Sequence, residues 1–153
     1  MKPLVLKMKA FGSYAEETTI DFNSLGTGLY LVTGDTGAGK TTIFDAIVFA
    51  LYGDVSGNHR SVAMMHTDFL PLSEDTVVTL EFEVNGETHT VTRKIHYPKS
   101  RESNGFGKMS QTAEFKESGK LTIKGTGNVT DRITELTGLT STQFQQIIML
   151  AQG

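Results

Sequence analysis

The pattern of hydrophobic and polar residues predicts three β-strands before residue 34. Residues 4–11 form the first strand, and only their second half alternates between the two classes. Residues 17–22 alternate as the second strand, after a turn at residues 12–14. A loop at residues 23–28 leads into a short apolar run at residues 28–33, which is typical of a buried strand. The chain therefore begins with a β-rich segment.

Residues 42–52 predict a helix that lies inside the protein. The segment is long enough for about three turns, and Gly53 follows it as a C-terminal stop. Its residues are apolar on nearly every face, whereas a surface helix has a polar face. We therefore expect this helix to be buried beneath a sheet.

The rest of the chain predicts a hairpin, a second β pair and two helices. Residues 76–84 alternate, Asn85-Gly86 is a preferred hairpin turn, and residues 88–97 run back. Residues 98–108 contain so few apolar side chains that we expect a mobile loop, and residues 109–124 predict the second β pair.

The two predicted helices lie after this β pair. Asn128 is the predicted N-cap of the first helix, which Gly138 stops. Thr140 or Ser141 caps the second helix, at the end of the chain.

A candidate phosphate-binding loop lies between the predicted strand at residues 28–33 and the buried helix. Residues 34–41 read Gly-Asp-Thr-Gly-Ala-Gly-Lys-Thr and fit the pattern G-x-x-x-x-G-K-[ST]. Glycines allow backbone N–H groups to surround a polyphosphate, Lys40 brings a positive charge to the β- and γ-phosphates, and the Thr41 hydroxyl is a ligand for Mg²⁺.

The following helix N-terminus favours an anion at the same place. A glycine-rich turn without a ligand is the alternative, and the order of strand, loop and helix argues against it. The residues expected to line the nucleotide are Asp35, Thr36, Gly37, Ala38, Gly39, Lys40, Thr41 and Thr42.

Composition narrows the class of protein only modestly. The 153 residues correspond to one domain, and 38% of them are hydrophobic, which is enough for a core. A net charge of −3 gives no global reason to expect nucleic acid, and the absence of cysteine excludes disulfides. Because the sequence has no signal-peptide core and no apolar run that spans a bilayer, we expect a cytoplasmic protein.

Gln152 is a second candidate for phosphate chemistry, at the end of a mostly apolar segment. Its amide offers an oxygen to Mg²⁺ and hydrogen-bonds a water, and a glutamine that places the attacking water recurs in phosphoryl-transfer sites. Taken alone, Gln152 is better explained as an ordinary exposed polar residue.

Several segments resemble one protein family. Residues 33–47, continuing to residues 50–53, closely resemble the Walker A segment of SbcC, the family of ATPase subunits of bacterial SbcCD nucleases. SbcC belongs to the structural-maintenance-of-chromosomes (SMC) type of ABC ATPase. The start of the chain is similar to the start of that family, and residues 149–153 look like its Q-loop.

The resemblance implies an α/β fold: a P-loop NTPase, the N-terminal lobe of an ABC-type ATPase head, with an antiparallel β subdomain and hairpin. It implies ATP and Mg²⁺ as cofactors and Lys40 and Gln152 as catalytic residues. By resemblance, Gln152 contacts the Mg²⁺ and senses the γ-phosphate. Met65 and Thr67 follow the P-loop helix where relatives line the base and ribose of the nucleotide.

Gly12 is a departure from the wider pattern. Many relatives outside SbcC have an arginine at this position, directly after the first-strand aromatic residue, which reaches toward the nucleotide. Any contact from this turn would come here from the backbone or from Ser13.

Two elements of an ABC-type ATPase are missing from the sequence. No apolar strand ends in the Asp-Glu pair of a Walker B segment, and no Leu-Ser-Gly-Gly-Gln signature occurs. The family places both in a C-terminal half, beyond a long coiled coil. Residues 1–153 therefore resemble the N-terminal half of the head, ending at the Q-loop, and we expect this chain alone to hydrolyse little ATP.

A basic segment is a candidate DNA contact. Residues 93–108 contain five cations and one acid, Glu102. The cations are Arg93, Lys94, Lys99, Arg101 and Lys108. Such a loop neutralises backbone phosphates without reading sequence, although an ordinary solvated loop has the same composition. The resemblance favours duplex DNA, at Lys99, Arg101 and Lys108.

Three functions remain as hypotheses. The first is the ATP-binding half of an SbcC-like subunit, whose partners would be its own C-terminal half, a second copy of the head in an ATP-dependent dimer, an SbcD-like nuclease and double-stranded DNA. The second is an SMC-type ATPase for chromosome organisation or recombination, without a nuclease. The third, the nucleotide-binding subunit of an ABC transporter, is disfavoured by the long first strand.

Overall fold

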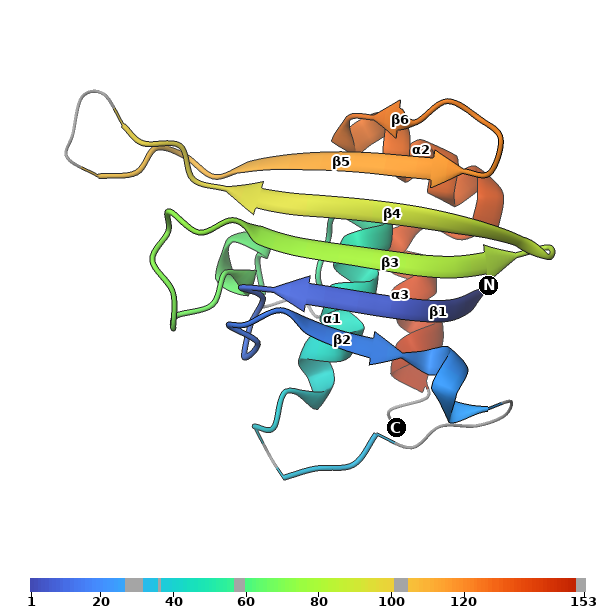
Figure 1. Ribbon diagram of the computed structural model, residues 1–153, viewed down its shortest axis with the longest axis horizontal. Helices are drawn as coiled ribbons and strands as arrows, with labels where there is room; N and C mark the ends of the chain where they lie inside the picture. Colours follow the sequence, from blue (N-terminus) through green and yellow to red (C-terminus); the bar gives the residue numbers. More distant parts are fainter. Residues whose placement is uncertain (27–31, 36, 57–59, 101–104, 151–153) are drawn as a thin grey trace.

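The computed structural model describes residues 1–26, 32–35, 37–56, 60–100 and 105–150. In this part of the chain, one antiparallel sheet has the order β2-β1-β3-β4-β5-β6, and the helices lie on one of its faces (Figure 1). The strands are β1 (Lys2–Lys9), β2 (Thr18–Asp21), β3 (Thr76–Val84), β4 (Glu87–His96), β5 (Ser110–Glu117) and β6 (Ile123–Lys124). The α-helices are α1 (Lys40–Tyr52), α2 (Thr126–Thr137) and α3 (Ser141–Leu150), and the 3-10 helices are η1 (Phe22–Leu25) and η2 (Val62–Met65).

The β3–β4 hairpin forms at the centre of the sheet as predicted. Asn85 and Gly86 have φ of 53° and 81°, the left-handed conformations that this two-residue turn requires. Val84 pairs with Glu87 and Thr76 with Ile95, so the register is continuous along both strands. Alternate residues of β3 are buried, which turns one face of the sheet toward the helices.

Helix α1 is buried against that face, which confirms the prediction of a helix beneath a sheet. It runs from Lys40 to Tyr52, and its C-cap is Gly53, whose φ is 71° and whose N–H donates to the carbonyl of Phe49 at 2.8 Å. Every residue from 45 to 52 is buried. Phe49 packs on Phe11, just after β1, with ring centroids 5.6 Å apart.

Arg93 fixes the C-terminal end of α1 to the sheet. Its guanidinium is fully buried and donates to the carbonyls of Ala50 and Leu51, each at 2.9 Å, and to Thr130 of α2 at 2.8 Å. Burial lowers the pKa of Arg93 to about 10. Arg93 therefore joins β4, α1 and α2, and it is not one of the exposed cations expected of the basic segment.

Two local predictions need revision, and the structure decides between Thr140 and Ser141 as the cap of α3. Helix α2 begins at Thr126 after Gly125, whose φ of 97° makes the turn, so Asn128 lies inside the first turn and donates to the carbonyl of Lys124. Thr140 caps α3, because it exchanges hydrogen bonds with Gln143 at 3.0 and 3.3 Å.

The second revision concerns the strand expected at residues 28–33. Residues 27–31 lie outside the described part of the chain, and Val32 and Thr33 belong to no strand and are exposed. A strand requires a neighbour that supplies hydrogen bonds, and no described strand pairs with these two residues.

No helix in the described ranges is long and apolar enough to cross a lipid bilayer.

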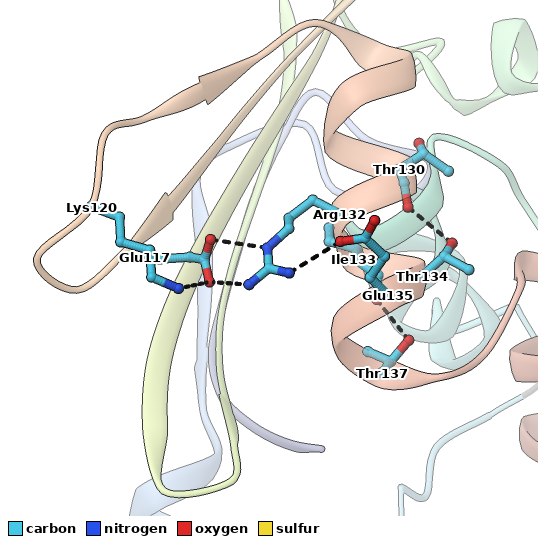
Figure 2. Close-up of polar contacts among 8 residues, drawn as sticks. All are labelled: Glu117, Lys120, Thr130, Arg132, Ile133, Thr134, Glu135 and Thr137. Atoms are coloured by element: carbon cyan, nitrogen blue, oxygen red, sulfur yellow. Dashed lines mark hydrogen bonds and ion pairs between the residues drawn. The ribbon is translucent and has the colours of Figure 1, made fainter.

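A charged cluster holds α2 against the end of β5 (Figure 2). Arg132 of α2 donates to both carboxylate oxygens of Glu117, at 2.8 and 3.1 Å, and Lys120 donates to the same carboxylate at 3.1 Å. The Glu117 side chain is only 5% exposed. Hydrogen bonds from Arg132 are the main cause that lowers the pKa of Glu117 from 4.5 to about 2.

This lowered pKa predicts a loss of stability in acid. The unfolded chain takes up a proton at Glu117 near pH 4.5 and the folded chain only near pH 2, so the stabilisation is complete above pH 4.5 and is lost as the pH falls toward 2. Urea unfolding at several pH values should show Glu117→Gln to be less stable than wild type by about 2 kcal/mol at pH 7, with convergence near pH 2.

Glu135→Gln is the matched control. Glu135 accepts from the same arginine at 3.2 Å, but its side chain is 71% exposed, so this change should have little effect at any pH. A gap between wild type and Glu117→Gln that stays constant from pH 7 to pH 2 would contradict the assignment.

Candidate functional site

A hollow of about 470 Å³ opens at the N-terminal end of α1, and we call it the α1 hollow. Its volume is within the range of small-molecule sites. Three segments that are distant in the sequence form its wall: the turn after β1, the glycine-rich loop with the start of α1, and the segment that follows α1. The lining residues are Ser13, Gly37, Gly39, Lys40, Thr41, Thr42 and Arg60.

Gly39 brings the loop close to the turn after β1. It is the N-cap of α1 with φ of 85°, and a Cβ at this position would lie 2.5 Å from Ser13 Oγ and 3.2 Å from the ring of Tyr14. Among the described residues, no side chain caps the helix. The first backbone N–H groups of α1 therefore have neither an intrahelical acceptor nor a described side-chain cap, which is the arrangement that binds anions.

Lys40 folds back over the loop. Its Nζ donates to the carbonyl oxygens of Gly34 at 2.5 Å and Asp35 at 2.7 Å. These are hydrogen bonds to neutral acceptors, so the ammonium group brings an unneutralised charge to the hollow. A polyphosphate is a stronger acceptor than these carbonyls, because its oxygens carry negative charge that attracts the ammonium group.

Arg60 supplies a second cation that the sequence analysis did not identify. It lines the α1 hollow, and its guanidinium donates to the buried carboxylate of Asp45 in α1. The sequence did contain a signal: Asp45 is the only charged residue within the apolar run 42–52, and a buried acid in a protein has a partner.

The geometry around Gly12 explains why no arginine side chain occupies that position. Gly12 has φ of 56°, and a Cβ there would lie 2.6 Å from Cγ2 of Thr42. Its N–H donates to the carbonyl of Met65 at 2.6 Å. The turn therefore packs directly on the first turn of α1, and it faces the hollow through Ser13, as expected when an arginine is absent.

The other residues predicted to bind the nucleotide lie partly in the α1 hollow, partly elsewhere on the loop and partly outside the described residues. Thr41 and Thr42 line the hollow, and Asp35 and Ala38 lie on the exposed part of the loop. Thr36 and Gln152 lie outside the described residues.

The structure does not bring Met65 and Thr67 to the α1 hollow. Both are buried, at 6% and 1% exposure, and Thr67 donates its N–H to the carbonyl of Ala10. Their contact with a base or ribose remains a prediction.

The predicted DNA residues lie on the connection between β4 and β5, which projects beyond the sheet (Figure 1). Lys99 pairs with Phe106 in a β-bridge, and the N–H of Gly107 donates to the carbonyl of Pro98 at 2.7 Å. The described ends of this segment therefore extend the hairpin. Lys99 and Lys108 are exposed, whereas Arg101 lies outside the described residues.

Comparisons with known sequences place the chain in one family, the AAA domain, whose profile matches residues 6–153. The chain is 39% identical over 160 residues to the SbcC subunit of the SbcCD nuclease from Vibrio cholerae. It is 35% identical over 156 residues to the SbcC subunit from Staphylococcus aureus. Both alignments cover 100% of this chain but only 16% and 15% of the relatives.

Comparisons with solved structures agree on the fold. A chain solved in work on ATP-driven dimerization and DNA stimulated activation of SMC ATPases matches with a TM-score of 0.60 and 19% identity, over 92% of this chain and 81% of that one. The SMC head domain from Thermotoga maritima matches with a TM-score of 0.50 and 23% identity, over 86% of this chain and 42% of that one. The fold is therefore that of the N-terminal lobe of an SMC-type ATPase head.

The close approach of Gly12 to α1 predicts that a single methyl group there is damaging. Gly12→Ala should lower the unfolding free energy by about 1–3 kcal/mol, because the Cβ meets Thr42 and the backbone conformation is unfavourable for alanine. Adding Thr42→Ser removes Cγ2 and should recover part of the loss. Chemical denaturation of the single and double variants measures both effects.

Gly127→Ala is the control for a change from glycine to alanine. Gly127 lies in α2 with open space around its Cα, so this variant should be neutral or more stable by up to about 1 kcal/mol. Equal stability of Gly12→Ala and wild type would show that the turn is not packed on the helix as described.

Proposed function

Because the chain belongs to the AAA-domain family and is homologous over its whole length to SbcC proteins, we propose that it is the ATP-binding N-terminal half of an SbcC-like ATPase head. The observation that carries the proposal is the α1 hollow. There, an uncapped helix N-terminus and two cations, Lys40 and Arg60, converge on one space. Such a site attracts a polyphosphate.

The chain's own residues divide the work of binding. Backbone N–H groups of Gly37 and of Gly39 to Thr41 surround the phosphates, and Lys40 exchanges the carbonyls of its own loop for phosphate oxygens. Thr42 and Ser13 line the same hollow. Asp35, Thr36 and Ala38 remain proposed nucleotide contacts of the same loop, in which the Ala38 N–H donates to the carbonyl of Asp35 at 3.1 Å.

The residues present fit Mg²⁺ as well. Thr41 lines the hollow next to Lys40, and its hydroxyl is a hard oxygen ligand of the kind that Mg²⁺ prefers. Gln152 is the second proposed ligand and would orient the attacking water. When bound, Mg²⁺ neutralises charge that develops on the phosphates during transfer.

The chain is a small part of the relatives it matches, so the activity of a complete protein is also a proposal. We infer that residues 1–153 pair with a C-terminal half that supplies a Walker B acid, and that two heads close on ATP. This closure would control an SbcD-like nuclease on DNA ends in the cytoplasm. The names of the relatives support this function over an SMC-type ATPase without a nuclease and over a transporter subunit.

The proposal predicts the behaviour of Lys40→Ala. Loss of the ammonium group should lower the affinity for a fluorescent ATP analogue by about 30- to 100-fold, as expected for a lost charge-assisted contact with phosphate. The unfolding free energy should change little, because the hydrogen bonds of Lys40 are exposed. Titration in the presence of Mg²⁺ measures the affinity.

Lys116→Ala is the matched control, since Lys116 is an exposed lysine on β5 far from the hollow. Its affinity should equal that of wild type. Equal affinity of Lys40→Ala and wild type would show that the α1 hollow is not the phosphate site.

The connection between β4 and β5 supports a second, narrower proposal. We propose that Lys99, Arg101 and Lys108 contact the DNA backbone. Replacing all three by glutamine should weaken duplex binding and reduce the slope of log K against log salt concentration by up to about 3. Lys7, Lys116 and Lys124, on β1, β5 and β6, provide a control triple variant of equal charge. An unchanged slope after substitution of Lys99, Arg101 and Lys108 would show that the connection between β4 and β5 does not contact DNA.

A further inference from the structure

Asp45 is a buried acid in the helix that follows the phosphate loop. The residue has 0% exposure and lies among the apolar residues of α1, about one turn after Lys40. A carboxylate loses much of its hydration at such a position, so other polar groups have to replace the water. The identity of these groups indicates what Asp45 does.

Both oxygens of the Asp45 carboxylate are used. Oδ1 accepts from the backbone N–H of Ser56 at 3.1 Å and also from the Ser56 hydroxyl, and Oδ2 accepts from Nη1 of Arg60. These contacts fix the plane of the carboxylate. They also attach the segment after α1 to the helix itself.

Arg60 lies between this carboxylate and the α1 hollow. Its side chain is 45% exposed and lines the hollow together with Lys40, whereas the Asp45 side chain is 1% exposed and does not line it. A guanidinium carries five N–H donors on three nitrogens, and Asp45 accepts from Nη1. The fork geometry allows one edge of the group to stay on the carboxylate while another contacts an anion.

We propose that Asp45 is a positioning residue for nucleotide binding: from inside the helix it holds the Arg60 guanidinium at the α1 hollow, so that Arg60 meets the phosphates in a fixed orientation. This inference rests on the proposed function of the hollow. It adds a buried acid, and the Ser56 contacts that orient it, to the loop residues that bind the nucleotide directly.

Whether removal of the Asp45 charge weakens or strengthens nucleotide binding distinguishes a positioning role from a purely electrostatic one. A negative charge one turn from Lys40 repels phosphates, so its removal would strengthen nucleotide binding if Asp45 acted only through its charge. If Asp45 positions Arg60, its removal weakens binding, because Arg60 then loses side-chain entropy when it is ordered by the nucleotide.

A double-mutant cycle with ATP and Mg²⁺ tests the proposal. The variants are Asp45→Asn, Arg60→Gln and the double variant, each measured for affinity by titration and for stability by urea unfolding. Asp45→Asn should weaken ATP binding by about 5- to 10-fold, because Arg60 remains present but loses side-chain entropy on binding, and it should have no further effect once Arg60 is glutamine. A residue that only stabilises the fold would lower stability without this coupling.

Ser56→Ala provides a second test that keeps the Asp45 charge, should Asp45→Asn fail to fold. It removes one of the two contacts to Oδ1, so ATP binding should weaken by about 2- to 3-fold in wild type and not at all in Arg60→Gln. Arg60→Lys retains the positive charge but lacks the planar guanidinium. Its affinity for ATP should therefore lie between that of Arg60→Gln and that of wild type.

The outcomes are distinct. Tighter binding by Asp45→Asn, or an equal loss in the presence and absence of Arg60, would overturn the positioning role while leaving the hollow as the nucleotide site. Failure of the wild-type chain to bind ATP would overturn the proposed function and this inference with it.

Discussion

The burial of α1 against the antiparallel sheet is the constraint on which the rest of the structure depends. A helix that is apolar on nearly every face has to be covered, and the inward residues of β1, β3 and β4 cover it. The two ends of α1 are then fixed in space. Because the glycine-rich loop runs directly into Lys40, the packing of the core decides where the backbone N–H groups of the loop point.

Charged side chains also hold α1 in place, in addition to apolar packing. At the C-terminal end of α1, Arg93 binds the last carbonyls of the helix from the adjacent strand. Near its N-terminal end, Asp45 binds Arg60 and Ser56 from the returning chain. Each of these groups is buried or half-buried and paired, so each connects two segments that are distant in the sequence. The α1 hollow therefore rests on a rigid element rather than on a free loop.

Much of this arrangement could be predicted from local patterns. The alternation in residues 76–97, the Asn85-Gly86 turn and the apolar run 42–52 each depend on neighbours in the sequence, and each formed as expected. The sequence analysis missed side-chain contacts between residues that are far apart in the sequence. Asp45 was visible as an acid in an apolar run, but its partner depends on how the chain returns after Gly53. Arg93 was grouped with the exposed cations of the basic segment, although it lies between Val91 and Ile95 in the alternation of β4 and therefore on the buried face.

The most direct test of a phosphate site at the start of α1 is a crystal structure of the chain with a non-hydrolysable ATP analogue and Mg²⁺. The account predicts that Lys40 Nζ leaves the carbonyls of Gly34 and Asp35 and binds the phosphates, which occupy the α1 hollow. An analogue bound elsewhere, with Lys40 still on those two carbonyls, would contradict it.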